Sequence, residues 1–169
     1  MSAAGMITTE KGLLEFLDDH HFPYRYSAHE AVFTCAEAEQ KRLQLPGAST
    51  KNLFLCDKKG KLFFLAVTAC AKQLDLEALG SRCGARGLRF GSEDNLSRLL
   101  GVTRGAVTVL GLLNDTDRLV ELWRDKQMWE STQFLCHPLV NTATLVLSKE
   151  TLEAFIRLTG HTIHLFDAP

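Results

Sequence analysis

The sequence predicts an α+β fold, with one domain built on a mixed, mostly antiparallel sheet that short helices flank. Short helical patterns alternate irregularly with many strand-like runs, and several runs are joined by tight turns, which favours hairpins over regular βαβ winding. A chain of 169 residues can bury a sizeable core and most simply forms one domain over residues 1–169. The sequence contains no internal repeat, low-complexity tract or interdomain linker.

A hairpin at residues 50–67 is the clearest single element. The apolar run 52–55 and the apolar run 61–67 flank Asp57-Lys58-Lys59-Gly60, which has the composition of a tight turn. Lys51 and Asn52 stand side by side at the start of this hairpin, just after a Pro-Gly loop. A lone Lys is most often a solvated surface residue. The residues alone therefore leave open whether the pair is a strand edge or part of a ligand site.

Cap residues and apolar spacing predict the other elements. Thr34 and Glu37 have the spacing of a capping box, Ser92 and Ser148 precede amphipathic runs, and glycines close several runs. The predicted helices cover residues 13–20, 35–42, 75–79 (closed by Gly80), 92–101 and 148–160, with a helical turn at 125–129. The predicted strands cover residues 24–26, 88–90, 105–113, 119–123, 143–147 and 162–166.

Composition excludes several classes of protein. Hydrophobic residues make up 46% and charged residues 23% of the chain, as in ordinary globular proteins, and the net charge is −1. There is no general basic excess, so any contact with nucleic acid must be local. Apolar runs are shorter than the ~20 residues of a membrane helix. The five cysteines are odd in number, contain no C-x-x-C and follow no secretory leader, so we expect free thiols in a cytoplasmic protein.

Simple chemical motifs give no strong candidate site. Cys136 and His137 are neighbours, but adjacent side chains of an extended segment point to opposite faces, and no pair has zinc-ligand spacing. A cysteine nucleophile with a histidine base stays open, with Cys35 near a helix start and no residue singled out. The glycines of 101–111 do not form a phosphate loop. They serve either close backbone packing or the presentation of N–H groups to a carbonyl.

Four blocks of sequence resemble the YbaK/ProX superfamily, also called the prolyl-tRNA synthetase-associated domain. The resemblance is greatest to its free-standing PrdX or ProXp-ala members and covers nearly the whole chain. The blocks are HEAVFT at 29–34, TKNLFLCDKKG at 50–60, GVTRGAVT at 101–108 with GLLND at 111–115, and CHPLVNTAT at 136–144. The combination of TKNLFL with HPLVN is the specific part of the signal.

The resemblance implies a partly barrel-like sheet and a hydrolase that acts in trans. Such a protein cleaves the ester between tRNA and a wrongly attached amino acid, chiefly alanine on the proline tRNA, without a metal or other cofactor. Its partner is the acceptor end of a mischarged tRNA, with prolyl-tRNA synthetase or an elongation factor as a further candidate, and with neither DNA nor a membrane.

Site roles follow from the same resemblance. Lys51 would contact a phosphate near the 3′ end of the tRNA, and Asn52 would fix the aminoacyl group. Backbone N–H groups around Gly111 would polarise the ester carbonyl, and His137 would order the pocket. The expected substrate-binding residues are Phe33, Thr108, Val109, Leu110, Cys136 and Asn141.

Departures from the family pattern concern the amino-acid preference. Val109-Leu110 stands where Ala-Phe or Pro-Phe is common, Cys136 replaces a Phe, and Arg104 replaces a Pro. Two alternatives therefore remain. One is a deacylase for another small amino acid such as serine or threonine, and the other is a non-catalytic module that binds tRNA or a synthetase.

Overall fold

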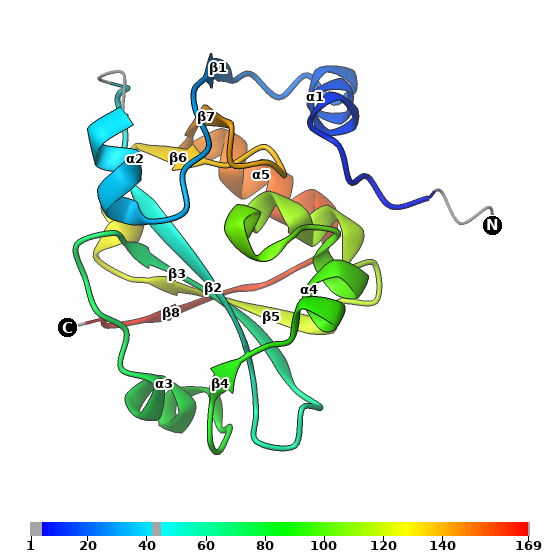
Figure 1. The fold of residues 1–169 in the computed structure, drawn as a ribbon. Helices are drawn as coiled ribbons and strands as arrows, with labels where there is room; N and C mark the ends of the chain where they lie inside the picture. The colour runs from blue at the N-terminus through cyan, green and yellow to red at the C-terminus, as the bar shows by residue number, and fades with distance from the viewer. Residues whose placement is uncertain (1–4, 42–44, 169) are drawn as a thin grey trace.

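The computed structural model describes residues 5–41 and 45–168, in which helices surround two packed β-sheets (Figure 1). The helices are α1 (Glu10–Asp19), α2 (Cys35–Lys41), α3 (Leu76–Cys83), α4 (Glu93–Leu100) and α5 (Lys149–Thr159). The strands are β1 (Arg25–Ala28), β2 (Thr50–Cys56), β3 (Phe63–Ala69), β4 (Arg89–Phe90), β5 (Val120–Asp125), β6 (Gln133–Cys136), β7 (Ala143–Ser148) and β8 (Ile163–Phe166). Three short 3₁₀ helices are η1 (Arg104–Ala106), η2 (Val109–Asn114) and η3 (Met128–Glu130).

The larger sheet has the strand order β4-β2-β3-β5-β8, and the smaller one has the order β1-β7-β6. Pairing is antiparallel except along β3-β5-β8, which is parallel. This mixed, mostly antiparallel pairing confirms the predicted α+β class. A bridge between Ala48 and Phe134 joins the segment before β2 to β6. Within the described ranges neither sheet closes on itself, so the expected barrel-like character is not found.

The hairpin predicted at 50–67 is confirmed as β2 and β3, which pair antiparallel from Thr50↔Ala69 to Cys56↔Phe63. Its turn is stabilised by the Asp57 carboxylate, which accepts hydrogen bonds from the backbone N–H groups of Lys61 and Leu62 at 2.7 and 3.0 Å. Gly60 in this turn has φ +67°, a conformation that glycine adopts at little cost. Local chemistry therefore fixes the register of the two central strands.

Predicted helix caps are confirmed at several positions. The hydroxyls of Ser92 and Ser148 accept hydrogen bonds from the first turns of α4 and α5. Gly101 and Gly160 end those helices in the left-handed conformation. The capping box of α2 differs in one detail. The Thr34 hydroxyl accepts from the Glu37 N–H as expected, but the Glu37 carboxylate accepts from the N–H of the residue before Thr34.

One predicted boundary is wrong, and one is not tested. Gly80 does not end α3, because the helix runs on to Cys83 and closes at Gly84, whose φ is +74°. A Cβ atom at Gly80 would lie 2.7 Å from the carbonyl oxygen of Ala85, so this glycine permits a close backbone approach inside the helix. The described part of α2 ends at Lys41, so the predicted end at residue 42 lies outside the described residues.

The predicted strand at 105–113 is also wrong, because η1 and η2 occupy this segment. The hydroxyl of Thr108 accepts a hydrogen bond from the Leu110 N–H at 3.2 Å, and the Gly111 N–H donates to the Thr108 carbonyl at 3.0 Å. A short apolar run does not distinguish a buried strand from a buried helical turn by its periodicity. Packing against other elements decides the conformation here.

The expectation of five free thiols is corrected by a disulfide between Cys35 and Cys70. Cys56, Cys83 and Cys136 remain as thiols. Cys35 is the first residue of α2 and Cys70 directly follows β3, so the fold brings together two cysteines that lie 35 positions apart in sequence. Spacing in the sequence carries no signal for such a pair.

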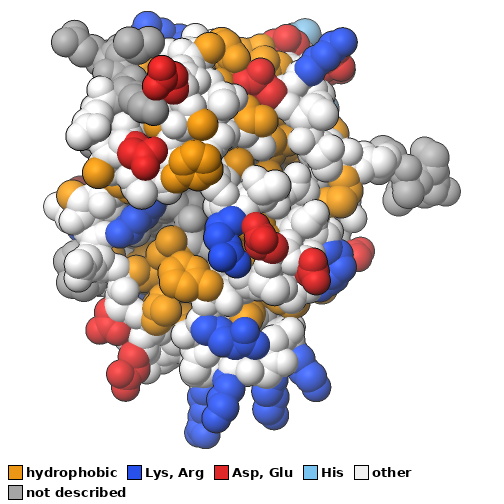
Figure 2. Space-filling view, viewed as in Figure 1, with side chains coloured by type: hydrophobic (Ala, Val, Ile, Leu, Met, Phe, Trp, Pro, Cys, Tyr) orange, Lys and Arg blue, Asp and Glu red, His pale blue; other side chains and the backbone are white. Residues whose placement is uncertain are grey.

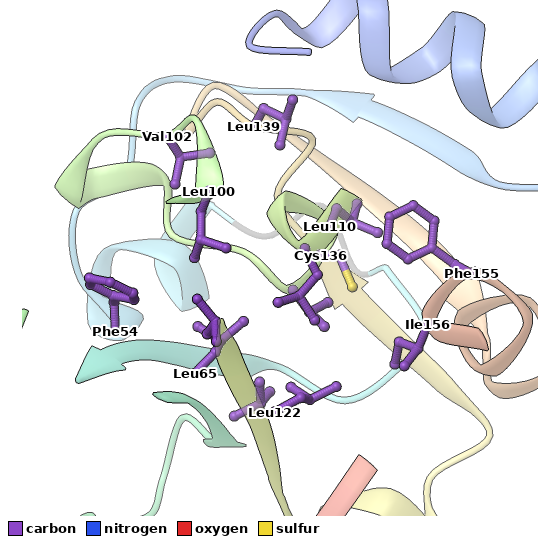
Figure 3. Packing of buried hydrophobic residues seen from close by; sticks show 14 of the residues in the cluster. Phe54, Leu65, Leu100, Val102, Leu110, Leu122, Cys136, Leu139, Phe155 and Ile156 are labelled. Atoms are coloured by element: carbon purple, nitrogen blue, oxygen red, sulfur yellow. The ribbon is translucent and has the colours of Figure 1, made fainter. Parts of the chain in front are cut away.

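The main core fills the space between the inner face of the larger sheet, the smaller sheet and helices α1, α4 and α5. Figure 3 shows Leu65 and Leu122 of the larger sheet, Cys136 of β6, Leu110 of η2 and Phe155 of α5 around this core. A smaller core lies on the other face of the larger sheet, where α3 contributes Leu79. None of the described helices has the length and apolar character that a membrane span requires.

Gly111 lies where a side chain would collide with α4. A Cβ atom at this position would lie 3.0 Å from the Leu100 carbonyl oxygen and 3.1 Å from the Leu100 Cβ atom. We expect Gly111→Ala to lower the free energy of unfolding by about 1–3 kcal/mol through overpacking. Urea denaturation would measure the loss. Gly5→Ala is the matched control, because Gly5 has no atom within 4 Å of its Cβ position, and an equal effect of both changes would contradict the packing argument.

Candidate functional site

A small cavity of about 60 Å³ opens beside the start of β2 and the end of β6. Its lining is uncharged apart from the titratable rings of two histidines and is drawn from six segments that are distant in sequence. The polar lining residues are Ser27, His29, Ser49, Thr50, Asn52, His137 and Thr144. The apolar lining residues are Val32, Ala38, Leu45, Cys70, Leu135 and Cys136. The cavity has room for roughly four water-sized groups, which is a small volume for a ligand.

Strand alternation separates the two residues at the start of the hairpin. Thr50 and Asn52 lie on the same side of β2 and both line the cavity, because side chains two apart share a face. Lys51 falls on the opposite face, and its partner across the ladder is Thr68. Within the part of the chain that the structure describes, no carboxylate pairs with the Lys51 ammonium group. The structure thus brings Asn52, but not Lys51, into the cavity.

Asn52 carries an unsatisfied polar atom in the cavity wall. Its Oδ1 atom is buried and has no hydrogen-bond partner among the described residues. A buried amide oxygen without a partner costs about 1–3 kcal/mol, so such atoms are uncommon in folded proteins. A ligand that donates a hydrogen bond to Oδ1 would recover that cost. Asn52 is therefore the first residue to consider as a ligand contact.

Two histidines are held in defined orientations at the cavity. The Nδ1–H of His137 donates to the Ala143 carbonyl at 3.3 Å, which leaves Nε2 as a potential acceptor. The Nδ1–H of His29 donates to the Glu30 carbonyl at 2.7 Å, and its Nε2 accepts from the Thr144 hydroxyl at 2.8 Å. Burial lowers the pKa of His137 below its usual value of 6.5, and nearby His29 lowers it further, while the Ala143 hydrogen bond acts in the opposite direction. His137 is therefore neutral at pH 7.

A buried cation lies next to the cavity lining at Cys136. Arg124 of β5 is 1% exposed, and its guanidinium carbon lies 4.3 Å from the ring centroid of Trp129 and 4.8 Å from that of Phe134. Its Nε and Nη1 atoms are buried without a hydrogen-bond partner among the described residues. Burial lowers the pKa of Arg124 to about 10, while Cys136 acts in the opposite direction, so the group stays charged at neutral pH.

Arg124 and Asn52 lie on one cross-strand row, because Asn52 pairs with Val67 and Val67 pairs with Arg124. The three buried side-chain polar atoms without partners in the described chain all belong to these two residues. The Cys136 thiol interacts with the Arg124 charge, but burial raises its pKa to about 11. A thiol that stays protonated is a weak nucleophile, so Cys136 does not suit covalent catalysis. Cys35 does not suit it either, because it is disulfide-bonded.

The predicted substrate-binding residues Phe33 and Asn141 lie beside the cavity without lining it. The Asn141 amide donates to the Val32 carbonyl at 2.9 Å, and the Val32 N–H donates to the Asn141 carbonyl at 3.2 Å. This pair of hydrogen bonds holds the segment that supplies Val32 to the cavity. Phe33 is 71% exposed and lies against Gly105, whose Cβ position would be 3.2 Å from the Phe33 ring.

The predicted site residues of η2 lie in the core. Thr108, Val109 and Leu110 are buried, and Figure 3 shows Leu110 among core side chains. None of the three lines the cavity, nor does Gly111. The Gly111 N–H donates to the Thr108 carbonyl, so it is engaged within its own turn rather than presented to a ligand in this conformation.

Sequence reasoning missed His29, Thr144 and Arg124. His29 and Thr144 stand inside the blocks that resemble the YbaK/ProX superfamily, so a signal for both was available. Arg124 had no signal, because a basic residue near the end of a predicted strand normally indicates a surface position. Among the described residues, no group of three or more His, Cys, Asp or Glu side chains could hold a metal ion.

Comparison with protein families identifies the class. The model of the aminoacyl-tRNA editing domain matches residues 29–155, which include the histidines and Asn52 of the cavity. The chain belongs to this family, and it is therefore an aminoacyl-tRNA hydrolase by class, as the sequence predicts.

Individual relatives support the same family. The chain is 35% identical over 153 residues to the prolyl-tRNA editing protein ProX of Acetoanaerobium sticklandii, and the alignment covers 90% of this chain and 93% of that protein. It is 36% identical over 163 residues to prolyl-tRNA synthetase associated domain-containing protein 1 of Danio rerio, covering 95% and 88%. The crystal structure of a proposed trans-editing enzyme for prolyl-tRNA synthetase has the same fold, with a TM-score of 0.66 at 18% identity, and the match covers 94% of this chain and 92% of that one.

The lowered pKa of His137 predicts a pH effect on stability. The unfolded imidazole titrates near 6.5, and the folded one titrates lower, so the unfolded state binds more protons in the interval between. The free energy of unfolding should therefore fall as the pH drops below about 6.5. Urea denaturation between pH 7.5 and 5 would measure the fall. His137→Gln should reduce the fall in the free energy of unfolding, whereas His20→Gln, at an exposed position, should leave it unchanged. A pKa of His137 at or above 6.5 in an NMR titration would contradict the argument.

Arg124 should contribute little net stability. Burying a charge costs several kcal/mol, and Arg124 has no carboxylate partner among the described residues to offset that cost. Replacing it by an apolar residue of similar length removes the cost. We expect Arg124→Met to leave the free energy of unfolding unchanged or to raise it, as measured by urea denaturation. Exposed Arg98→Met serves as the control for loss of charge. A loss above about 2 kcal/mol would mean that the contacts with Trp129 and Phe134 outweigh the desolvation of the charge.

Proposed function

We propose that this protein hydrolyses, in trans, the ester that joins a wrongly attached amino acid to tRNA, with alanyl-tRNA(Pro) as the preferred substrate. The observation that carries the proposal is the buried, unpartnered Oδ1 atom of Asn52, a residue that lines a small cavity. An aminoacyl ester presents a free α-ammonium group with three donors. Asn52 Oδ1 and His137 Nε2 offer acceptors that match such a group, and the neutral state of His137 avoids repelling it.

The absence of charged side chains other than the histidines from the described lining suits this reaction. An aminoacyl ester is already activated, so a site has to orient it, stabilise the developing oxyanion and admit water. A strong nucleophile is not required. In the YbaK/ProX superfamily the terminal ribose hydroxyl of the tRNA helps to activate the water. With this mechanism the protein only has to position the ester and the water.

Selectivity in this proposal comes from volume. In this proposal the small cavity holds an alanyl group, and its walls exclude the larger prolyl ring. Serine differs from alanine by one hydroxyl, and an apolar wall discriminates weakly against such an addition. Seryl- and threonyl-tRNA are therefore the competing substrates.

A local basic surface supports tRNA as the partner. Figure 2 shows Lys and Arg side chains projecting from the end of the molecule where the β2–β3 turn lies. Exposed cations at this turn and in the loop beside it are Lys58, Lys59, Lys61, Arg86 and Arg89. They offer phosphate contacts although the net charge of the chain is −1. Lys51 at the start of β2 would contact a phosphate closer to the 3′ end.

A deacylation assay on a panel of tRNA(Pro) charged with alanine, serine, threonine or proline tests the proposal. We expect alanyl-tRNA(Pro) to be hydrolysed fastest. Asn52→Ala should lower kcat by about 100-fold, because an ester whose ammonium group is no longer held is misplaced for reaction. Lys51→Ala should raise KM by about 10- to 150-fold, since a charge-assisted contact contributes about 1.5–3 kcal/mol.

Asn95→Ala and Lys11→Ala are the matched controls, because both side chains lie on helices outside the cavity. If no ester is hydrolysed faster than in buffer while the tRNA still binds, the non-catalytic binding module replaces this proposal. If seryl- or threonyl-tRNA reacts fastest, the hydrolase remains and the alanine preference is wrong.

A further inference from the structure

The disulfide between Cys35 and Cys70 stands at the rim of the cavity. Its Cα atoms are 5.7 Å apart, within the usual range for a disulfide. Cys70 itself lines the cavity, and Ala38, one turn further along α2 from Cys35, lines it as well. The bond therefore ties α2, which contributes to one wall of the cavity, to the end of the central strand β3.

Among the described residues, helix α2 lies outside the hydrophobic cores. None of its described residues belongs to either core cluster, and it is only seven residues long. Short helices are marginally stable without tertiary packing. The segments on both sides are anchored, by the Asn141–Val32 hydrogen bonds before α2 and by the Ala48–Gln133 and Leu135–Ala48 hydrogen bonds after it. Between these anchors, the covalent bond fixes the position of α2 over the cavity.

The other cysteines are poor competitors for thiol chemistry. Cys56 and Cys136 are buried, and burial raises the pKa of Cys83 to about 12 with a further increase from Glu121. Cys35 and Cys70 are both partly exposed, so a small thiol can reach them. Among the five cysteines, Cys35 and Cys70 are therefore the pair best placed to react with a small thiol.

We propose that Cys35 and Cys70 form a reversible thiol–disulfide site that sets the width of the cavity, an inference that rests on the proposed function for its effect on substrates. In the oxidised protein α2 closes the cavity wall and large acyl groups are excluded. In the reduced protein α2 moves away, the cavity widens, and discrimination between alanyl and prolyl esters falls.

The chemistry is ordinary thiol–disulfide exchange with a low-molecular-weight thiol such as glutathione. A thiolate attacks one sulfur, forms a mixed disulfide and releases the other cysteine as a thiolate that takes up a proton. A second thiol attacks the mixed disulfide and releases the remaining cysteine. The protein disulfide and two thiols thus give two protein thiols and one small disulfide, and oxidised glutathione drives the reverse reaction.

The first measurement needs no tRNA. Denatured protein that was oxidised with glutathione disulfide should show three thiols, as Cys56, Cys83 and Cys136, and five after treatment with dithiothreitol. Trypsin, which has targets between residues 41 and 51, should cut this region of the native reduced protein at least 10-fold faster than that of the native oxidised protein. Cys35→Ser and Cys70→Ser should match the reduced protein under oxidising conditions, and Cys83→Ser should match the wild type.

The second measurement is the ratio of kcat/KM for alanyl-tRNA(Pro) to that for prolyl-tRNA(Pro), which should be at least 10-fold higher in the oxidised protein. Five thiols after oxidation would overturn the site. A disulfide that changes neither the rate of cleavage nor the substrate ratio would overturn its control of the cavity. If no ester is hydrolysed at all, the proposed function fails, while the thiol count and proteolysis still decide whether the redox site exists.

Discussion

The β2–β3 ladder is the constraint on which the site depends. Seven paired residues and the Asp57 turn fix the register of β2, and a shift by one residue would exchange its two faces. This register sends Thr50 and Asn52 to the cavity and Lys51 to the opposite face. Because β3 also pairs with β5, the same ladder sets Arg124 in line with Asn52. The position of the polar atoms at the cavity is thus a consequence of sheet register.

The cross-strand row from Asn52 to Arg124 contains three buried polar atoms that have no hydrogen-bond partner among the described residues. A buried charge costs several kcal/mol unless a partner offsets it, and here the aromatic faces of Trp129 and Phe134 supply the main compensation. Cys136 lines the cavity, interacts with the Arg124 charge and remains a neutral thiol at pH 7. The cost of burying this charge therefore falls on residues directly beside the cavity lining.

Local signals predicted most of the fold, and tertiary contacts decided what they missed. The hairpin, the serine caps and the terminating glycines Gly101 and Gly160 depend on residues close in sequence, so they could be read directly. The 3₁₀ segment around Thr108 and the disulfide of Cys35 depend on neighbours far away in the chain. The same distinction applies to the site. His137 and Asn52 came from a resemblance, and strand alternation alone would have separated Lys51 from Asn52. The buried position of Arg124 depends on aromatic partners that no local pattern reveals.

The cavity joins two kinds of structure with different stability. The strands that carry Asn52 and Cys136 belong to the two sheets and contribute to their core, so packing holds their geometry. The wall that carries Ala38 belongs to a short helix outside both cores. Local opening in proteins concentrates where few apolar contacts resist it. The polar contacts to the acyl group would therefore stay constant while the size limit varies with the position of α2. In such an arrangement recognition of the aminoacyl ester and exclusion by volume are physically separable, and a change at α2 can alter which amino acid fits without disturbing the atoms that hold it.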